Sequence, residues 1–384
     1  MDSDVFAILT DAALDITPVS GWTHNFYRYP ARFSPRFAAA AIQCFSRPSD
    51  LVLDPYMGGG TVVVEGVAAG RRVVGNDLNS LAAFIAKVKV TSLTSAELRA
   101  IRQWAIEHIP LFSYTQPAKD LNQFVDSPKT KNLSLVRARF IKKVVAAALA
   151  TIVDLPTETS RDFAKCIVLR VSQWALDGRE HHTPLNDFRA KLSAVAEEML
   201  EASRALGTIL QANNSRATLL NMDASLLDRS PVFSSDGQKA ALVVTSPPYP
   251  GVHVLYHRWQ VDGRRETPAP YWIAGCSDGQ GASFYNFADR RESAADAYFE
   301  KSLNTLKTVR RVMHDGGHIV QLLAFNRPED QLPRYLDNMR DAGFAESRIG
   351  RSRIWRQVPN RKWHAALLGK TNSSHEVILV HRAI

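Results

Sequence analysis

The sequence predicts an α/β protein in which a doubly wound sheet is interrupted by a helical insert. Two observations lead to this fold class. Residues 51–79 alternate between strand, glycine turn, helix and strand, as at the start of a doubly wound sheet. Strand-like runs resume only after the helical stretch 93–213. We therefore expect an N-terminal part of the sheet domain at 1–92, the insert at 93–213, and a C-terminal part at 214–384.

Each element of the first part follows from local patterns. "LVLDPY" (51–56) is a short apolar run typical of a buried strand, and "MGGGT" (57–61) is a turn. "VVVEGVAAG" (62–70) predicts a helix that ends at its last glycine, and "RRVVGNDLN" (71–79) predicts the second strand.

The insert opens with a plausible capping box, in which Thr94 and Glu97 precede an apolar periodicity. Helical patterns then cover about 133–153, 159–176 and 184–212, rich in Ala and Leu. The later strands are predicted in "RATLLNMDASLL", "AALVVTSPPY", "GGHIVQLLAF" and "HEVILVHR". We expect no internal repeat.

Composition narrows the class of protein. The 384 residues are 45% hydrophobic, but no apolar run reaches the roughly 20 residues of a membrane span. The acidic start lacks signal-peptide features, and the three cysteines are isolated, so we expect a cytoplasmic protein with no zinc site, no disulfides and no membrane partner. The net charge of +9 favours a polyanionic partner such as nucleic acid, although incidental basicity remains an alternative.

Three acids follow three successive predicted strands: Asp54, Asp77 and Asp223. Ligands of open parallel sheets bind beyond the carboxyl ends of the strands, where a glycine-rich turn lets the backbone approach them. Asp54 precedes the triple glycine 58–60 and could hold a cationic amine, while Asp77 could accept from ribose hydroxyls and Asp223 from an exocyclic amine. A single acid at a strand end is more often a cap or turn residue, but three of them form a stronger pattern.

The segment "TSPPY" (245–249) follows an apolar strand. Two consecutive prolines end a β-ladder, because neither has an N–H and both restrict φ. A hydroxyl stands before this rigid turn and an aromatic ring after it. The alternative is an incidental strand-terminating turn.

These motifs together resemble a known family. "DPYMGGGT" resembles the DPFxGxGT motif of S-adenosylmethionine-dependent amino methyltransferases that act on DNA, and "TSPPY" resembles their (D/N/S)PPY catalytic motif. "HNFYRYPARFSPRF" (24–37) is similar to a segment that closes over the cofactor in one branch. The resemblance covers about 21–79 and 215–384 and implies a Rossmann-like methyltransferase sheet. The sequence departs from the pattern at Tyr56, where phenylalanine is commoner, and in the position of the insert.

The resemblance implies a role for each matching position. Asp54 and the glycine backbone would face the methionine moiety of the cofactor, Asp77 the ribose and Asp223 the adenine. The implied cofactor-binding residues are Phe33, Ser34, Asp54, Tyr56, Gly58, Gly60, Thr61, Asp77 and Asp223.

The implied catalytic residues are Ser246, Pro247, Pro248 and Tyr249. Ser246 Oγ and the Pro247 carbonyl would accept the two hydrogens of an exocyclic amine, and Tyr249 would stack on a flipped-out base. Serine before Pro-Pro is typical of cytosine-N4 enzymes, whereas Asp or Asn is typical of adenine-N6 enzymes. We therefore expect a site-specific, cytosine-N4 DNA methyltransferase.

Alternatives are an adenine-N6 enzyme, an RNA base methyltransferase and a catalytically silent nucleic-acid-binding protein. A nicotinamide enzyme is disfavoured by the missing GxGxxG. DNA is the expected partner, and a cognate restriction endonuclease is a candidate for a second. The insert could bind or select DNA, although a charged helical face is often merely solvated. The candidate DNA-binding residues are Arg137, Arg139, His253, Tyr256, Arg258, Arg353, Arg356 and Arg361.

Overall fold

The computed structural model describes residues 3–29, 34–115, 127–179, 181–250, 258–263, 265–279, 294–325, 327–347, 353–357 and 375–384. His253, Tyr256, Arg361 and Phe33 lie outside these ranges. Within the described ranges, no helix combines the length and apolarity needed to cross a bilayer.

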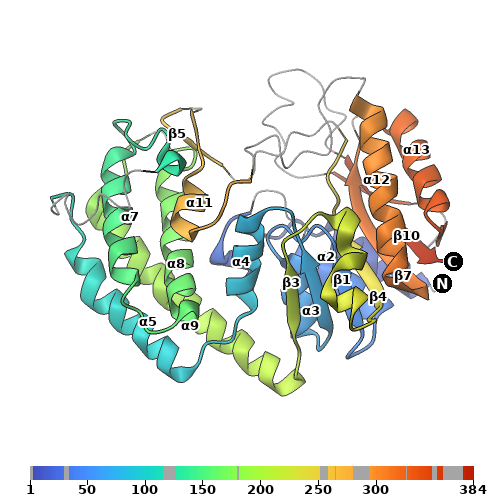
Figure 1. The fold of residues 1–384 in the computed structure, drawn as a ribbon, viewed down its shortest axis with the longest axis horizontal. Helices are drawn as coiled ribbons and strands as arrows, with labels where there is room; N and C mark the ends of the chain where they lie inside the picture. Colours follow the sequence, from blue (N-terminus) through green and yellow to red (C-terminus); the bar gives the residue numbers. More distant parts are fainter. Residues whose placement is uncertain are drawn as a thin grey trace.

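Eight strands of the described part of the chain form a sheet at the centre of the molecule (Figure 1), in the order β3-β2-β1-β4-β7-β10-β8, with β9 pairing with β10. β3, β2, β1, β4 and β7 pair in parallel, and β10 is antiparallel to β7. This mixed, mostly parallel sheet confirms the predicted α/β class. The strands of this sheet are β1 (Leu51–Asp54), β2 (Arg72–Asn76), β3 (Ala217–Leu220), β4 (Ala240–Thr245), β7 (Met313–Ala324), β8 (Phe344–Glu346), β9 (Ile354–Gln357) and β10 (His375–Ala383).

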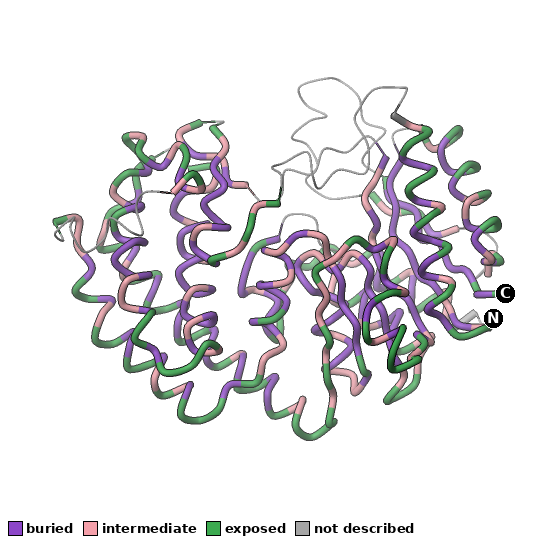
Figure 2. Tube along the Cα trace, in the orientation of Figure 1, coloured by how far each residue is buried: buried purple, intermediate pink, exposed green. Residues whose placement is uncertain are grey.

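Helices cover both faces of this sheet, which explains why its central strands are apolar at successive positions. β1 is buried along its whole length (Figure 2). Its Val52 packs with the helices on one face, whereas Leu51 and Leu53 pack with those on the other. The helices on the Val52 face include α1 (Ser3–Leu14), α2 (Pro35–Phe45) and α3 (Thr61–Ala68), and those on the other include α10 (Pro231–Ser234), α12 (Ala294–Arg311) and α13 (Pro328–Asp341).

The helices between β2 and β3 form most of a second body, which we call the helical lobe (Figure 1, left). It consists of α5 (Ser95–His108), α7 (Arg139–Ile152), α8 (Glu158–Leu176), α9 (Leu185–Asn213), α11 (Ala269–Ala274) and the hairpin β5–β6 (Trp259–Val261 and Arg265–Thr267). The capping box predicted for Thr94 and Glu97 is present, with the Thr94 hydroxyl accepting from the Glu97 N–H.

The lobe includes a segment from beyond β4. The hairpin and α11 pack in the same core as α7 and α8, although the sequence division places them with the C-terminal part of the sheet domain. Helix α4 (Ser80–Val90) connects the lobe to the sheet, because Ile85 packs in the core of the lobe and Ala86 in the core beside the sheet. The insert is thus completed by residues far along the chain.

Candidate active site

The glycine turn and the Ser-Pro-Pro-Tyr segment lie side by side because their strands are neighbours. β1 pairs in parallel with β4, so both strands end at the same edge of the sheet. The order of the strands also reverses here, since β2 lies on one side of β1 and β4 on the other. Such a switch point is where open α/β sheets bind ligands. The Thr245 hydroxyl joins the two loops by donating to Asp54 Oδ1 at 2.8 Å.

The glycine turn has a conformation that requires glycine. Gly60 caps α3 with a φ of 75°, and Gly58 has a φ of 46°, both in the left-handed region. A Cβ on Gly59 would lie 2.8 Å from Cβ of Tyr29, so the missing side chains also admit that ring. Tyr29 comes from the segment 24–37, which the family resemblance predicts to close over the cofactor.

Burial raises the pKa of two carboxyl groups at this edge, Asp54 and Asp77. Desolvation raises the pKa of Asp54 to about 7, against the opposing effect of its hydrogen bonds from Thr245 and the Tyr56 N–H. Desolvation likewise raises the pKa of Asp77 to about 6. Asp77 accepts from the backbone N–H of Gly58 at 2.9 Å and thereby ties the end of β2 to the glycine turn. A cationic or hydrogen-donating ligand would stabilise both carboxylates.

Asp223 is exposed and follows β3, so it lies along the same edge of the sheet. It is the N-cap of the 3-10 helix η5 (Ala224–Arg229), and its Oδ1 accepts from the N–H and the hydroxyl of Ser225, both at 2.8 Å. Capping thus accounts for one of its carboxylate oxygens.

The Ser-Pro-Pro-Tyr segment is held from two sides. Ser246 Oγ and the Tyr249 hydroxyl are 3.0 Å apart, and the Tyr249 hydroxyl donates to Glu376 on β10 at 2.8 Å. From α12, the Tyr298 hydroxyl donates to the Pro248 carbonyl at 2.9 Å. These contacts restrict the turn beyond what its two prolines impose.

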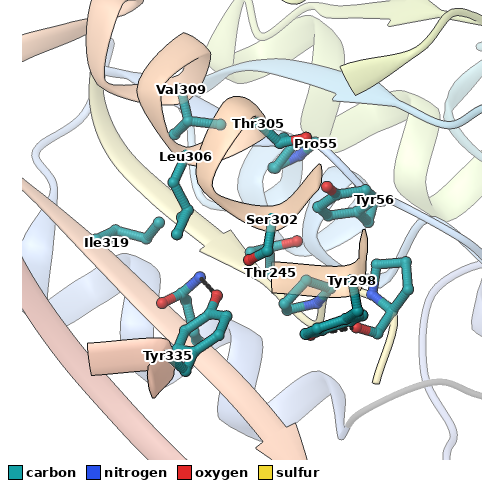
Figure 3. A pocket seen from close by; sticks show the side chains of 13 residues that line it. Pro55, Tyr56, Thr245, Tyr298, Ser302, Thr305, Leu306, Val309, Ile319 and Tyr335 are labelled. Carbon is teal, nitrogen blue, oxygen red and sulfur yellow. Dashed lines mark hydrogen bonds between the residues drawn. The ribbon is translucent and has the colours of Figure 1, made fainter. Parts of the chain in front are cut away.

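A small cavity lies behind this segment (Figure 3), with room for about one water molecule. Tyr56 and Tyr298 line it together with residues of α12 and β7, so the Tyr56 ring is directed towards α12. Gln321 donates to the Tyr335 hydroxyl at 2.7 Å, and its Oε1 is buried without a partner among the described residues. The cavity is too small for a nucleobase, and it lies between the Ser-Pro-Pro-Tyr segment and residues of α12 and β7.

Two other predicted cofactor residues lie at the starts of helices. Thr61 is the first residue of α3 and is buried. Ser34 is the N-cap residue of α2, without a capping bond from its side chain.

The predicted DNA-binding arginines differ in how they are engaged. Arg139 is exposed on α7, with its guanidinium 4.8 Å from the centre of the Phe140 ring. Arg137 is also exposed and forms an ion pair of 3.3 Å with Asp262. Both lie on the helical lobe.

The three remaining DNA-binding candidates that the structure describes are also paired with carboxylates: Arg258 with Asp278, Arg353 with Glu346, and Arg356 with Glu376. Arg356 is the least suited to contact DNA, because its side chain is only 12% exposed. The DNA-binding role of all these residues remains a prediction.

Sequence reasoning missed four residues that shape the site: Tyr29, Thr245, Tyr298 and Glu376. Thr245 precedes the motif, and a hydroxyl beside a buried strand-end acid could have suggested it. Glu376 is the one acid in the apolar run "HEVILVHR", which is a weak signal of a buried partner. Nothing in the order of the sequence connects it, or Tyr298, to the motif.

Comparison with known proteins bears on the first part of this site. Residues 6–87 match the family model of N6/N4 methyltransferases, described as DNA methylase. Over 83 residues, the chain is 37% identical to the Type II methyltransferase M.MvaI of Kocuria varians, an alignment that covers 21% of this chain and 18% of that protein. The matched segment contains the glycine turn and Asp77, and it agrees with S-adenosylmethionine as the cofactor.

Solved structures give more distant likenesses. TrmN from Thermus thermophilus aligns at 12% identity and a TM-score of 0.36, covering 94% of this chain and 52% of that one. The rRNA methyltransferase AviRa from Streptomyces viridochromogenes aligns at 11% identity and a TM-score of 0.36, covering 99% and 93%. Likenesses this weak carry no argument about the substrate.

Proposed function

We propose that this chain is a site-specific DNA methyltransferase that transfers a methyl group from S-adenosylmethionine to N4 of a flipped-out cytosine. The observation that carries the proposal is the hydrogen bond between Thr245 and Asp54. It joins the glycine turn to Ser-Pro-Pro-Tyr at the switch point of the sheet. A methyl donor held at the glycine turn would therefore lie next to a methyl acceptor held at Ser-Pro-Pro-Tyr, as methyl transfer requires.

The residues at this edge fit S-adenosylmethionine. Asp54 would pair with the ammonium group of the methionine moiety, which would favour the ionised form that burial disfavours. The glycine turn leaves its backbone accessible, Asp77 would accept from the ribose, and Asp223 from the adenine amine. When bound, the cofactor supplies an electrophilic methyl group on a sulfonium.

The Ser-Pro-Pro-Tyr segment would make the amine nucleophilic. The lone pair of a nucleobase amine is delocalised into the ring, so the amine attacks poorly until its hydrogens are held. Ser246 Oγ and the Pro247 carbonyl would accept those hydrogens and direct the lone pair at the methyl carbon. The nitrogen then gains the methyl group and loses one proton to solvent. Tyr249 would stack on the extruded base.

DNA would be held partly by the helical lobe. Arg137 and Arg139 are the exposed basic candidates there, and Arg139 lies beside the Phe140 ring. The net charge of +9 supports a polyanionic substrate. A partner restriction endonuclease and a cytoplasmic location would suit a modification enzyme and belong to the same proposal.

The test uses purified protein, tritiated S-adenosylmethionine and DNA of mixed sequence, with nucleoside mass spectrometry of the product. We expect N4-methylcytosine. N6-methyladenine would keep the chemistry and contradict the assigned base, and label on RNA alone would contradict DNA as substrate. Bound cofactor without any product would favour a silent binding protein.

A further inference from the structure

We propose that Glu376 is a positioning residue for methyl transfer, which acts through the Tyr249 hydroxyl to keep both lone pairs of Ser246 Oγ available to the substrate amine. This inference rests on the proposed function and extends it to a residue that no motif includes. Glu376 is separated from Tyr249 by more than a hundred residues of sequence and meets it only in the fold.

The contact is built by the sheet. Glu376 lies on β10 directly opposite Arg356 on β9, and its side chain is 5% exposed. Arg356 donates to Glu376 Oε2 from Nε at 2.8 Å, with Nη2 at 2.7 Å from the same oxygen. Arg356 is held in turn by the Ala13 carbonyl, which accepts from Nη1 at 3.2 Å. The buried carboxylate is therefore paired, and its Oε1 accepts from Tyr249.

The direction of the hydrogen bonds follows from the donor count. A phenol has one hydrogen, and Tyr249 gives it to Glu376 Oε1 at 2.8 Å. In the 3.0 Å contact between Ser246 and Tyr249, the donor must then be Ser246. With its hydrogen directed at Tyr249, Ser246 Oγ presents only acceptor lone pairs to an amine.

Without the Glu376 carboxylate, nothing would fix Ser246 as the donor and Tyr249 as the acceptor in their hydrogen bond. A phenol that is free to donate to Ser246 would occupy one of its lone pairs and release the serine hydrogen. That hydrogen could then point at the amine, which it would repel rather than hold. Glu376 thus makes Ser246 Oγ, which could otherwise donate or accept, act only as an acceptor towards the amine.

Glu376→Gln tests this with a side chain of nearly the same shape. Arg356 has only donors, so the amide oxygen would face it and the NH2 would face Tyr249. The NH2 would donate to the phenol oxygen, and the Tyr249 hydrogen would turn to Ser246. We expect kcat for DNA methylation to fall about 10-fold or more, with the Kd for S-adenosylmethionine unchanged.

A double-mutant cycle separates this role from a merely structural one. Tyr249→Phe keeps the ring but removes the relay, so we expect kcat to fall about 10-fold, and Glu376→Gln in that background to change kcat by less than about 2-fold. Glu346→Gln is the matched control, because Glu346 is also a strand carboxylate paired with an arginine, Arg353. We expect it to leave kcat unchanged.

Three results would overturn the inference: wild-type kcat in Glu376→Gln, the same fold-loss in both backgrounds, or wild-type kcat in Tyr249→Phe. The last measurement remains decisive if Glu376→Gln does not fold. Wild-type protein that binds cofactor and methylates no nucleic acid would contradict the proposed function itself, and the role of Glu376 with it.

Discussion

Asp54 is a carboxyl group whose charge depends on what lies beside it. It is 1% exposed at the end of β1, and its pKa is raised to about 7 by desolvation. A cation placed against it would restore the carboxylate and release a proton. Ligand binding and protonation should therefore be coupled near neutral pH.

We predict that S-adenosylmethionine binds more tightly as the pH rises from about 6 to about 8, because a carboxylate that is already ionised need not lose a proton. Calorimetry at pH 6.5 in buffers of different ionisation enthalpy should detect proton release. The Asp54→Asn variant should bind S-adenosylmethionine weakly, and its affinity should not depend on pH in this range. Release that persists unchanged in Asp54→Asn would assign the proton to another group.

The same shift bears on the stability of the ligand-free protein. The native carboxyl holds its proton up to about pH 7, whereas the unfolded one loses it near the ordinary aspartate pKa of 3.8. The native state therefore binds more protons between these values, and the contribution of Asp54 to the free energy of unfolding is lost as the pH rises through this window. Asp54→Asn should flatten this part of the stability profile, measured by urea unfolding at several pH values.

At the Ser-Pro-Pro-Tyr segment we predict a reciprocal pair of effects. Ser246→Ala and Tyr249→Ala should lower turnover by about 100-fold or more while the cofactor Kd changes little, because neither side chain would bind the cofactor. Asp54→Ala should instead abolish cofactor binding. Calorimetry and single-turnover methylation distinguish the two classes, and retained binding in Asp54→Ala would reject its assigned role.

At the scale of elements, the start of α3 depends on a left-handed residue. Gly60 has a φ of 75°, and a Cβ there would lie 3.1 Å from Cβ of Ala86 on α4. Both backbone strain and a close contact therefore oppose substitution. The strain is common to other left-handed glycines, whereas the contact is particular to this turn.

We predict that Gly60→Ala lowers the free energy of unfolding by about 1–3 kcal/mol. Gly178→Ala is the control, because Gly178 has a φ of 65° but a Cβ there would have no atom within 4 Å of it. It should show the strain alone and lose less stability, as measured by urea denaturation. Equal losses would show that the contact with Ala86 adds nothing.

Helix α7 presents the exposed Arg139 beside Phe140. If it contacts a DNA phosphate, Arg139→Ala should weaken binding and reduce the slope of log K against log salt by about 1. Fluorescence anisotropy of labelled DNA over a salt series measures this. Arg340→Ala on α13, where the side chain is 71% exposed and paired with Asp337, should leave the slope unchanged. The same slope in both variants would exclude Arg139 as a contact.

At the scale of the whole molecule, buried polar contacts join segments that are distant in sequence. The Trp259 Nε1–H donates to the Tyr27 hydroxyl at 2.9 Å, and both side chains are almost fully buried. Gln173 on α8 pairs with both the N–H and the carbonyl of Arg28. The N-terminal segment that leads to the glycine turn is thus held by the helical lobe.

We predict that Tyr27→Phe destabilises the protein by about 1–3 kcal/mol, because it leaves the indole N–H buried without its acceptor. Tyr114→Phe should cost less than about 0.5 kcal/mol, since Tyr114 is only half-buried and its hydroxyl lies 3.5 Å from an exposed histidine. Urea unfolding followed by tryptophan fluorescence compares the two. A cost for Tyr27→Phe no larger than that of the control would contradict this role.

The elements that could be predicted are those whose signals are local. The helices expected at 159–176 and 184–212 are observed at Glu158–Leu176 and Leu185–Asn213, because apolar periodicity and caps act within a few residues. Contacts such as Trp259 with Tyr27 could not be predicted, since they depend on how the chain returns after β4.

The sequence by itself determined the alternation of strands and helices, the glycine turn, and the hydroxyl–proline–proline–tyrosine turn, because the steric limits that proline sets on φ and apolar periodicity are local properties. Only the tertiary structure decided that β1 and β4 are neighbours, that Asp54 is buried enough to raise its pKa, and that Glu376 meets Tyr249. Strand order and desolvation arise from contacts between distant residues, and so the environment of each predicted side chain emerged only with the fold.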